Sequence, residues 1–261
     1  MAKRLKLPTR ALGAEPGIPD VAGLAAWIAD HRGITADIVT YLLDRSLGPQ
    51  IPAGIMASCA GGRFYKNRIL QCLSGVEGGK ATGEISLDSH PISEDAAGII
   101  VQKKDAWCAL PAPHVLGITD TYYDDEYEWN AAITGVYRTL MRSMRDIGIR
   151  GHVLICDTIA EHEITSLVRQ NVFLFQQKAD RQSLACLLEH QHQIAVHGDQ
   201  LGYLLDLSGE YDLRKVIILD PDPGSIARAL SCLDPDQVSA GGYCTAMCEH
   251  YWKNLVDAAV Y

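Results

Sequence analysis

Long apolar runs and basic residues are both scarce in this 261-residue sequence. No window approaches the roughly 20 continuous apolar residues that span a bilayer, and the N-terminus lacks the apolar core of a signal peptide. We therefore expect no membrane partner and a cytoplasmic protein. The 23 Lys and Arg residues are outnumbered by 32 Asp and Glu residues, so the net charge is −9. Because an acidic surface repels phosphates, we expect no nucleic-acid partner and predict a small-molecule ligand.

Two motifs of cofactor chemistry are also absent. There is no G-x-G-x-x-G, which removes the dinucleotide-binding fingerprint, and the eight cysteines include no C-x-x-C. The cysteines are scattered through apolar segments and form no disulfide framework. In a cytoplasmic protein we expect reduced cysteines, most of them buried as small apolar side chains.

The first half of the sequence, residues 1–150, has mixed patterns. Helical spacing of apolar residues predicts helices over 20–31 and 35–46, with Asp20 and Thr35 as caps, and a long helix within 122–148 that Gly148 ends. Residues 83–88 are predicted to form a strand. Residues 97–102 and 106–111 are also predicted as strands, and only three residues separate them. So short a connection indicates an antiparallel hairpin, and we predict a mixed α+β region.

The second half, residues 151–261, alternates regularly. Predicted strands at 152–156, 171–175, 193–197 and 215–219 alternate with predicted helices near 160–169, 180–190, 199–206 and 225–232. Such alternation predicts an α/β fold with a mainly parallel sheet covered on both faces. We interpret it as a Rossmann-like layered sheet, with an α/β barrel as the alternative. The two regions form separate domains or one continuous domain.

Polar residues follow the predicted parallel strands, at the edge where such folds bind ligands. Asp157, His197 and Asp199 are the candidate catalytic residues, with His197 as general acid or base. Asp157, His197, Asp220 and Asp222 are the candidate ligands of a divalent metal ion. The competing explanation for each Asp is that it caps the next helix or forms a turn.

A glycine pair opens a predicted helix at Gly61 and Gly62, with Arg63 and Lys66 behind it. Free backbone N–H groups beside positive charge would bind an anionic cofactor. The alternative is a plain loop followed by a solvated helix face.

Cys244 and Cys248 lie near the C-terminus, close to His250. With a distant cysteine such as Cys156, the two thiolates could bind zinc or an iron–sulfur cluster. The favoured interpretation is instead a terminal helix that begins after Gly241 and Gly242. The apolar stripe that would dock this helix on the core consists of Cys244, Met247, Cys248, Tyr251, Trp252 and Leu255.

These patterns predict an enzyme that acts on a small, anionic molecule at the carboxyl edge of a parallel sheet. Metal-assisted hydrolysis or lyase chemistry suits the residue types best. One alternative is a thiolate-dependent protein that binds or assembles a metal or iron–sulfur cofactor, and another is a non-catalytic, small-molecule-binding homo-oligomer. The cofactor remains unknown, with a divalent metal ion ahead of an iron–sulfur cluster.

Overall fold

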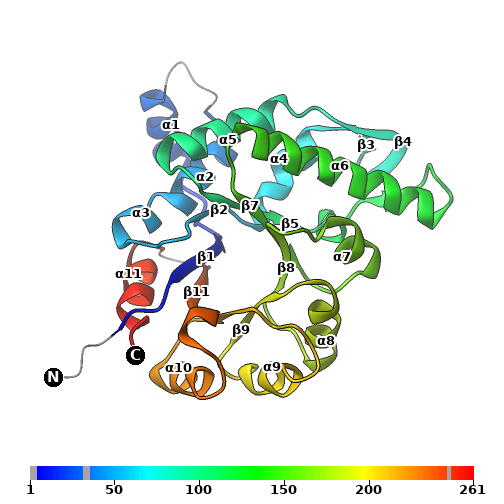
Figure 1. The fold of residues 1–261 in the computed structure, drawn as a ribbon. Coiled ribbons are helices and arrows are strands. Elements are labelled where there is room, and N and C mark those ends of the chain that lie inside the picture. The colour runs from blue at the N-terminus through cyan, green and yellow to red at the C-terminus, as the bar shows by residue number, and fades with distance from the viewer. Residues whose placement is uncertain (1–4, 32–35, 246–247) are drawn as a thin grey trace.

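The computed structural model describes residues 5–31, 36–245 and 248–261. Two four-stranded parallel sheets form its centre, with strand orders β1-β11-β10-β9 and β2-β5-β7-β8 (Figure 1). Their strands are β1 (Thr9–Ala14), β2 (Cys59–Gly61), β5 (Trp107–Pro111), β7 (Gly151–Cys156), β8 (Val172–Gln176), β9 (Gln193–His197), β10 (Lys215–Leu219) and β11 (Val238–Cys244).

The two sheets meet along both of their edges. Between β1 and β2, Ala57 donates its N–H to the Thr9 carbonyl and accepts from the Ala11 N–H, both at 3.0 Å. Between β8 and β9, the buried side chain of Gln191 replaces a strand-to-strand ladder. It bonds the N–H and the carbonyl of Leu174 at 2.9 and 3.0 Å and the carbonyl of Gln193 at 3.0 Å. The strands therefore form a closed ring in the order of the sequence.

The predicted α/β class, the mainly parallel sheet of the second half and an antiparallel hairpin in the first half are all confirmed. Of the two arrangements considered, the closed ring corresponds to the barrel. A layered sheet would leave its edge strands unpaired, whereas here the edges β1 and β9 are linked to β2 and β8 through Ala57 and Gln191. The pairs β1–β11 and β5–β7 also cross the boundary predicted near residue 150.

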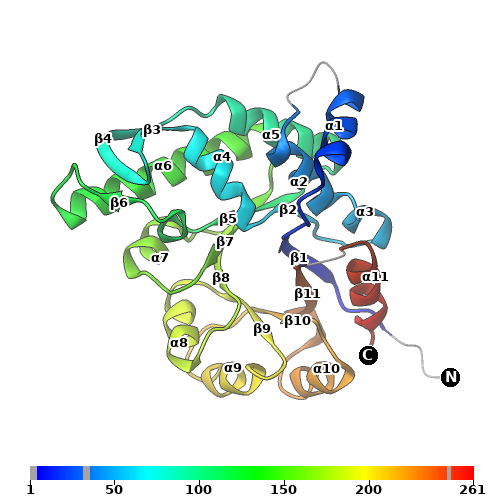
Figure 2. The same ribbon diagram turned by 180° about the vertical axis from the view of Figure 1, so that it is seen from behind.

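Helices surround the ring, and α8, α9 and α10 lie side by side on its outside in both views (Figures 1 and 2). A third sheet, of three strands, lies beside α4 and α6, away from the barrel. The helices are α1 (Val21–Asp30), α2 (Ile38–Leu47), α3 (Gln50–Ala53), α4 (Lys66–Gln71), α5 (His90–Gln102), α6 (Glu126–Ile147), α7 (Glu161–Leu167), α8 (Arg181–His190), α9 (Leu201–Leu207), α10 (Pro223–Leu230) and α11 (Cys248–Ala258), with 3₁₀ turns at Arg63–Tyr65, Pro113–Leu116 and Pro235–Gln237. The outer strands are β3 (Leu73–Glu77), β4 (Lys80–Leu87) and β6 (Thr119–Asp120).

Local sequence accounts for most helix boundaries. Asp20 caps α1, as predicted, by accepting from the Gly23 N–H at 2.6 Å. Asp37 caps α2, whereas the predicted cap Thr35 lies outside the described residues. The long helix α6 ends at Gly148, as its apolar spacing indicated.

The interior of the barrel is filled with side chains. Val153 and Ile155 belong to one buried cluster, whereas Leu154 and Cys156, which alternate with them on β7, belong to another. Phe175 on β8 and Tyr243 on β11 touch, with ring centroids 5.8 Å apart, although their strands are not neighbours. The first cluster therefore fills the inside of the ring and extends to the buried face of α11, which includes Trp252. The second cluster joins the ring to its other helices.

The hairpin predicted for residues 97–102 and 106–111 is wrong. Residues 97–102 belong to α5, and residues 107–111 form β5, which pairs in parallel with β2 and β7. Ile92, Ala96 and Ile99 are buried at helical spacing on α5, whereas Val101 is 88% exposed. An apolar residue on the solvent side thus gave a helix the appearance of a buried strand. The actual hairpin is formed by β3 and β4.

The segment around the glycine pair at 241–242 also differs from the prediction. Gly241 and Gly242 are inside β11, and the described part of the terminal helix is Cys248–Ala258. Its buried face includes Cys248, Trp252 and Leu255, as the apolar stripe indicated, whereas Cys244 ends the strand and Met247 lies outside the described residues. Beside this helix, Leu5 and Tyr261 exchange two backbone hydrogen bonds of 3.0 Å.

Nowhere in the described ranges is a helix both long and apolar enough to cross a membrane.

Candidate functional site

The carboxyl ends of the eight barrel strands bring polar side chains to one rim. In parallel α/β folds this edge is where loops and helix starts converge on a ligand. Each strand contributes the residue at its end or just after it. The rim residues used below are Glu15 after β1, Arg63 after β2, His114 after β5, Asp157 after β7, His197 at the end of β9, Asp220 after β10 and Tyr243 near the end of β11.

One group on this rim is built around Arg63. Its guanidinium lies 2.6 Å from the carboxylate of Asp157, and this hydrogen bond is the largest cause that lowers the pKa of Asp157. The backbone N–H of Arg63 donates to Glu15 at 2.5 Å, and the hydroxyl of Tyr243 donates to the same carboxylate oxygen. Gly62 permits this approach, because a Cβ there would lie 2.8 Å from that oxygen. Four segments of the chain are thus joined.

A second group joins β9, β10 and α11. The His197 Nδ1 lies 3.9 Å from the Asp220 carboxylate, which also accepts a hydrogen bond from the Tyr251 hydroxyl. Asp220 has a φ of +45°, a conformation that residues other than glycine rarely adopt. Burial and the Asp220 carboxylate both raise the pKa of Tyr251, so its hydroxyl stays protonated and donates. The group thus places an imidazole, a carboxylate and a phenolic hydroxyl together on the rim.

A buried carboxylate supports the first group from below. Glu163 is 1% exposed and accepts from the backbone N–H of His114 at 2.7 Å and from its ring Nδ1 at 2.9 Å. The other ring nitrogen, Nε2, accepts from the Asp157 N–H at 3.2 Å. These bonds fix the tautomer of His114 and hold the loop that carries Asp157.

The predicted catalytic and metal residues have different environments. Asp157 and His197 lie on the rim, in the first and second groups respectively, while Asp199 is exposed in the turn after β9. Asp220 is the partner of His197. Asp222 caps α10, accepting from the N–H groups of residues 224 and 225 at 2.7 and 3.1 Å. Asp222 is therefore a helix cap, which was the alternative to its predicted role as a metal ligand.

The predicted anion-binding residues are also engaged with the protein itself. Gly61 ends β2 with a φ of +84°, and Gly62 follows it. The Arg63 N–H already has the Glu15 carboxylate as its acceptor, while the Lys66 ammonium donates to the Val115 carbonyl at 3.2 Å. The guanidinium of Arg63 remains the cationic group that faces the rim.

The predicted metal chemistry depends on His, Cys, Asp and Glu side chains. In the residues that the structure places, no three of these side chains are grouped so as to hold a metal ion. Cys244 and Cys248 are joined to each other by a disulfide, contrary to the expectation that they are reduced. Cys156 lies in the cluster outside the ring, whereas the two disulfide cysteines lie in the inner cluster. The other six cysteines are free thiols.

Several rim residues could not be found from the sequence pattern. Glu15 follows β1, and Tyr243 belongs to β11. The segments of these two strands, TRALGA and VSAGGYC, are rich in small residues and lack the apolar runs of the other strands. Tyr251 was assigned to an apolar stripe. His114 and Glu163 are 49 positions apart in the sequence, and no local motif marks them as a pair.

Comparison with known proteins shows the fold. No family model matches the chain, and no curated protein matches its sequence. A solved structure from Listeria monocytogenes, named as a candidate vitamin-B12-independent methionine synthase, superposes with a TM-score of 0.67 at 16% identity, covering 97% of both chains. A methyltransferase from Methanosarcina mazei superposes with a TM-score of 0.54 at 10% identity, covering 97% of this chain and 93% of that one. At these identities the likeness concerns the fold.

Proposed function

We propose that this chain is an enzyme that transfers a methyl group between small molecules at the carboxyl rim of its barrel. The observation that carries the proposal is that one rim holds both the Arg63–Asp157 ion pair and the group of His197, Asp220 and Tyr251. The names of the two solved structures, a methionine synthase and a methyltransferase, support methyl transfer as the reaction class. Fold alone does not determine function, so the site must supply the chemistry.

The ion pair favours a substrate that carries both charges. The side chains of Arg63 and Asp157 are 34% and 60% exposed, so a ligand can reach both. A guanidinium binds a carboxylate through two parallel hydrogen bonds, and a carboxylate binds an ammonium group. An amino acid such as methionine meets both requirements. Its carboxylate is the anionic group that the sequence led us to expect.

Proton transfer would be the task of His197. A thiol or amine that accepts a methyl group must lose its proton as its lone pair attacks the methyl carbon. His197 would take that proton, and the bond from the methyl group to the donor would break with its electron pair on the donor atom. The carboxylate of Asp220, held by the Tyr251 hydroxyl, would stabilise the resulting imidazolium.

Calorimetric titration of the protein with L-methionine tests the binding half of this proposal. We expect L-methionine to bind, and methioninamide, which lacks the carboxylate, to bind at least about tenfold more weakly. The variant R63Q should lose a similar factor for L-methionine. R142Q, which removes an exposed arginine from α6, is the matched control and should bind as the unmodified protein does.

The chemical half is tested with H197Q. Mass spectrometry would follow methylation of small thiols in the presence of a methyl donor. We expect H197Q to form product about a hundredfold more slowly, the usual effect of losing a general base, with unchanged L-methionine affinity. Absence of binding by L-methionine and by thiol amino acids, or an R63Q variant that binds normally, would contradict the proposal.

Hydrolase or lyase chemistry is a second candidate. It is supported by the position of Asp157, His197 and Asp220 on one rim, where a divalent metal ion could assist if these side chains moved together. In that case His197 would activate a water molecule or remove a proton from carbon. Cleaved products instead of methylated ones would favour this candidate, and tight binding without any turnover would favour a non-catalytic binding protein.

A further inference from the structure

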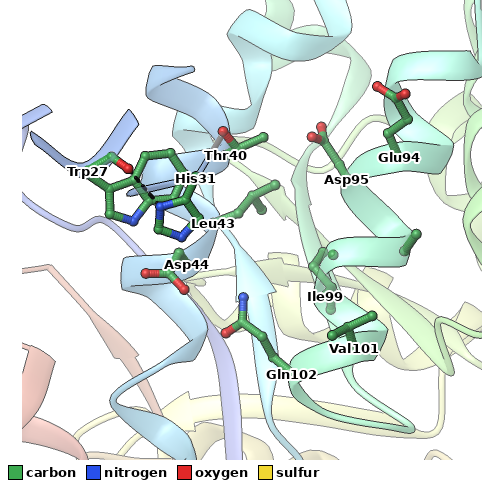
Figure 3. Close-up of a pocket in the computed structure, with 12 residues that line it drawn as sticks. Trp27, His31, Thr40, Leu43, Asp44, Glu94, Asp95, Ile99, Val101 and Gln102 are labelled. Carbon is green, nitrogen blue, oxygen red and sulfur yellow. Dashed lines mark hydrogen bonds between the residues drawn. The ribbon is translucent and has the colours of Figure 1, made fainter. Parts of the chain in front are cut away.

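A concave region lies away from the barrel rim, between α1, α2 and α5 (Figure 3). Its volume is about 980 Å³, at the upper end of the roughly 300 to 1,000 Å³ that is typical of small-molecule pockets. None of its described lining residues belongs to either of the rim groups. We call it the α1–α5 groove.

One wall of the α1–α5 groove is aromatic. Trp27 stacks on His31, with ring centroids 3.9 Å apart, and meets the edge of Tyr41 at 5.5 Å. The ring Nδ1 of His31 donates to the Trp27 carbonyl at 2.7 Å, since a carbonyl can only accept. Both rings are therefore fixed in place at the end of α1, and a face of this pair is available to a ligand.

The floor and the opposite wall are apolar. Leu43 of α2 and Ile99 of α5 are 5% and 2% exposed. In Figure 3, Leu43 lies between the aromatic pair and α5, and Ile99 lies on α5. Val101, at the opening of the groove, is 88% exposed. No residue of α1 is buried, although its sequence VAGLAAWIAD is almost entirely apolar. The groove thus leaves apolar surface uncovered that a ligand could bury.

The charged side chains in the described lining of the groove are of one sign. Its described lining includes Asp44, Glu94 and Asp95 and no Lys or Arg. Asp95 is neutralised from behind by Arg68, whose Nε lies 2.8 Å from the carboxylate. The carboxylate of Asp44, half-buried on α2 below the Trp27–His31 pair, is the acidic group best placed to contact a ligand (Figure 3).

We propose that the α1–α5 groove binds an organic ammonium ion with an apolar body. The ammonium group would lie between the Asp44 carboxylate and the Trp27 ring, which attract a cation through charge and through the ring quadrupole. The apolar body would cover the exposed surface of Trp27 and Val101, above the buried floor of Leu43 and Ile99. A neutral ligand would gain only the second contribution, and an anion would be repelled.

Three probes of matched shape test this proposal by isothermal titration: phenethylammonium, 2-phenylethanol and 3-phenylpropionate. We expect phenethylammonium to bind at least about tenfold more tightly than the alcohol, and the propionate not to bind. D44N should weaken phenethylammonium binding about tenfold, and W27A about fivefold, without affecting the alcohol to the same extent.

The matched controls are D206N and Y203A, which alter exposed residues of α9 on the far side of the barrel (Figure 1). Both should bind phenethylammonium as the unmodified protein does. Far-ultraviolet circular dichroism would check that W27A keeps its helices, and D44N tests the site without altering an aromatic contact. Equal affinity for the three probes, no binding of phenethylammonium, or normal binding by D44N would overturn the proposal.

Discussion

His152 on β7 is completely buried, and neither of its ring nitrogens has a hydrogen-bond partner. Burial, and to a lesser extent the positive charge of Arg145, lowers its pKa to about 3. An imidazole in this position is stable only when neutral. The residue therefore makes the stability of the fold depend on pH, although it lies in the wall of the barrel and not on the rim.

The direction of this dependence follows from the two pKa values. Below its ordinary pKa of about 6.5, His152 takes up a proton in the unfolded chain but not in the folded one. Its contribution is complete above pH 6.5 and is lost progressively as the pH falls towards 3, by about 1.4 kcal/mol per pH unit. Urea denaturation of H152L at several pH values should show this slope removed. H190L, which removes an exposed imidazole, should keep it, and equal slopes in all three proteins would disprove the assignment.

At the scale of elements, two glycines have opposite effects on the helix or strand that contains them. Gly135 lies inside α6 with nothing within 4 Å of an added Cβ. Gly242 lies in β11 against α11, where a Cβ would meet the Tyr251 hydroxyl and would lie 2.8 Å from Leu255. The first glycine only adds flexibility to a helix, whereas the second allows strand and helix to touch.

Urea denaturation of G135A and G242A should therefore give opposite changes in the free energy of unfolding. Alanine at 135 should stabilise the protein by about 0.5 to 1 kcal/mol, because helical glycine is unfavourable. Alanine at 242 should destabilise it by about 1 to 3 kcal/mol through overpacking and should displace Tyr251 from Asp220. If G242A were as stable as the unmodified protein, the close contact between β11 and α11 would be wrong.

For the whole molecule, the closed ring makes the two halves of the chain depend on each other. β1, β2 and β5 come from the first 150 residues, and β7 to β11 come from the rest. Each half alone would expose the edges that the β1–β11 and β5–β7 pairs cover. The core inside the ring also draws side chains from both halves, such as Trp107 and Phe173.

We accordingly expect one cooperative unfolding transition. In urea, far-ultraviolet circular dichroism and tryptophan fluorescence should give coincident curves, since Trp107 and Trp252 lie in the same inner cluster although they come from opposite halves of the chain. Fragments 1–150 and 151–261, expressed separately, should show no cooperative transition. Two separated transitions in the whole chain would contradict a single folding unit.

The sequence predicted some parts of this molecule better than others, for physical reasons. The strands at 152–156, 171–175, 193–197 and 215–219 were recognised because strands covered on both faces are apolar at nearly every position. β1 and β11 escaped recognition because small residues replace large apolar ones there. Without these two strands, the sequence could not show that the sheet closes.

The residues of the candidate site could also be predicted only in part from the sequence. Asp157, His197 and Asp220 were identified by their position after strands, which holds for an open sheet and for a barrel alike. Their partners could not be identified, because Arg63 and Tyr251 reach them from segments 94 and 31 residues away along the chain. Sequence position thus predicted the edge of the sheet, and only the folded chain provided the pairs.

The backbone hydrogen bonds between Leu5 and Tyr261 hold the first and last described residues of the chain side by side. Because Leu5 lies beside Tyr261 and the strands follow one another in cyclic order, the strand order itself does not require the barrel to begin at β1. A short linker between these residues, with a new opening at the exposed Gly209 after α9, would leave every strand pair and both rim groups unchanged. The linear order of the gene is then one of several circular permutations compatible with the same fold.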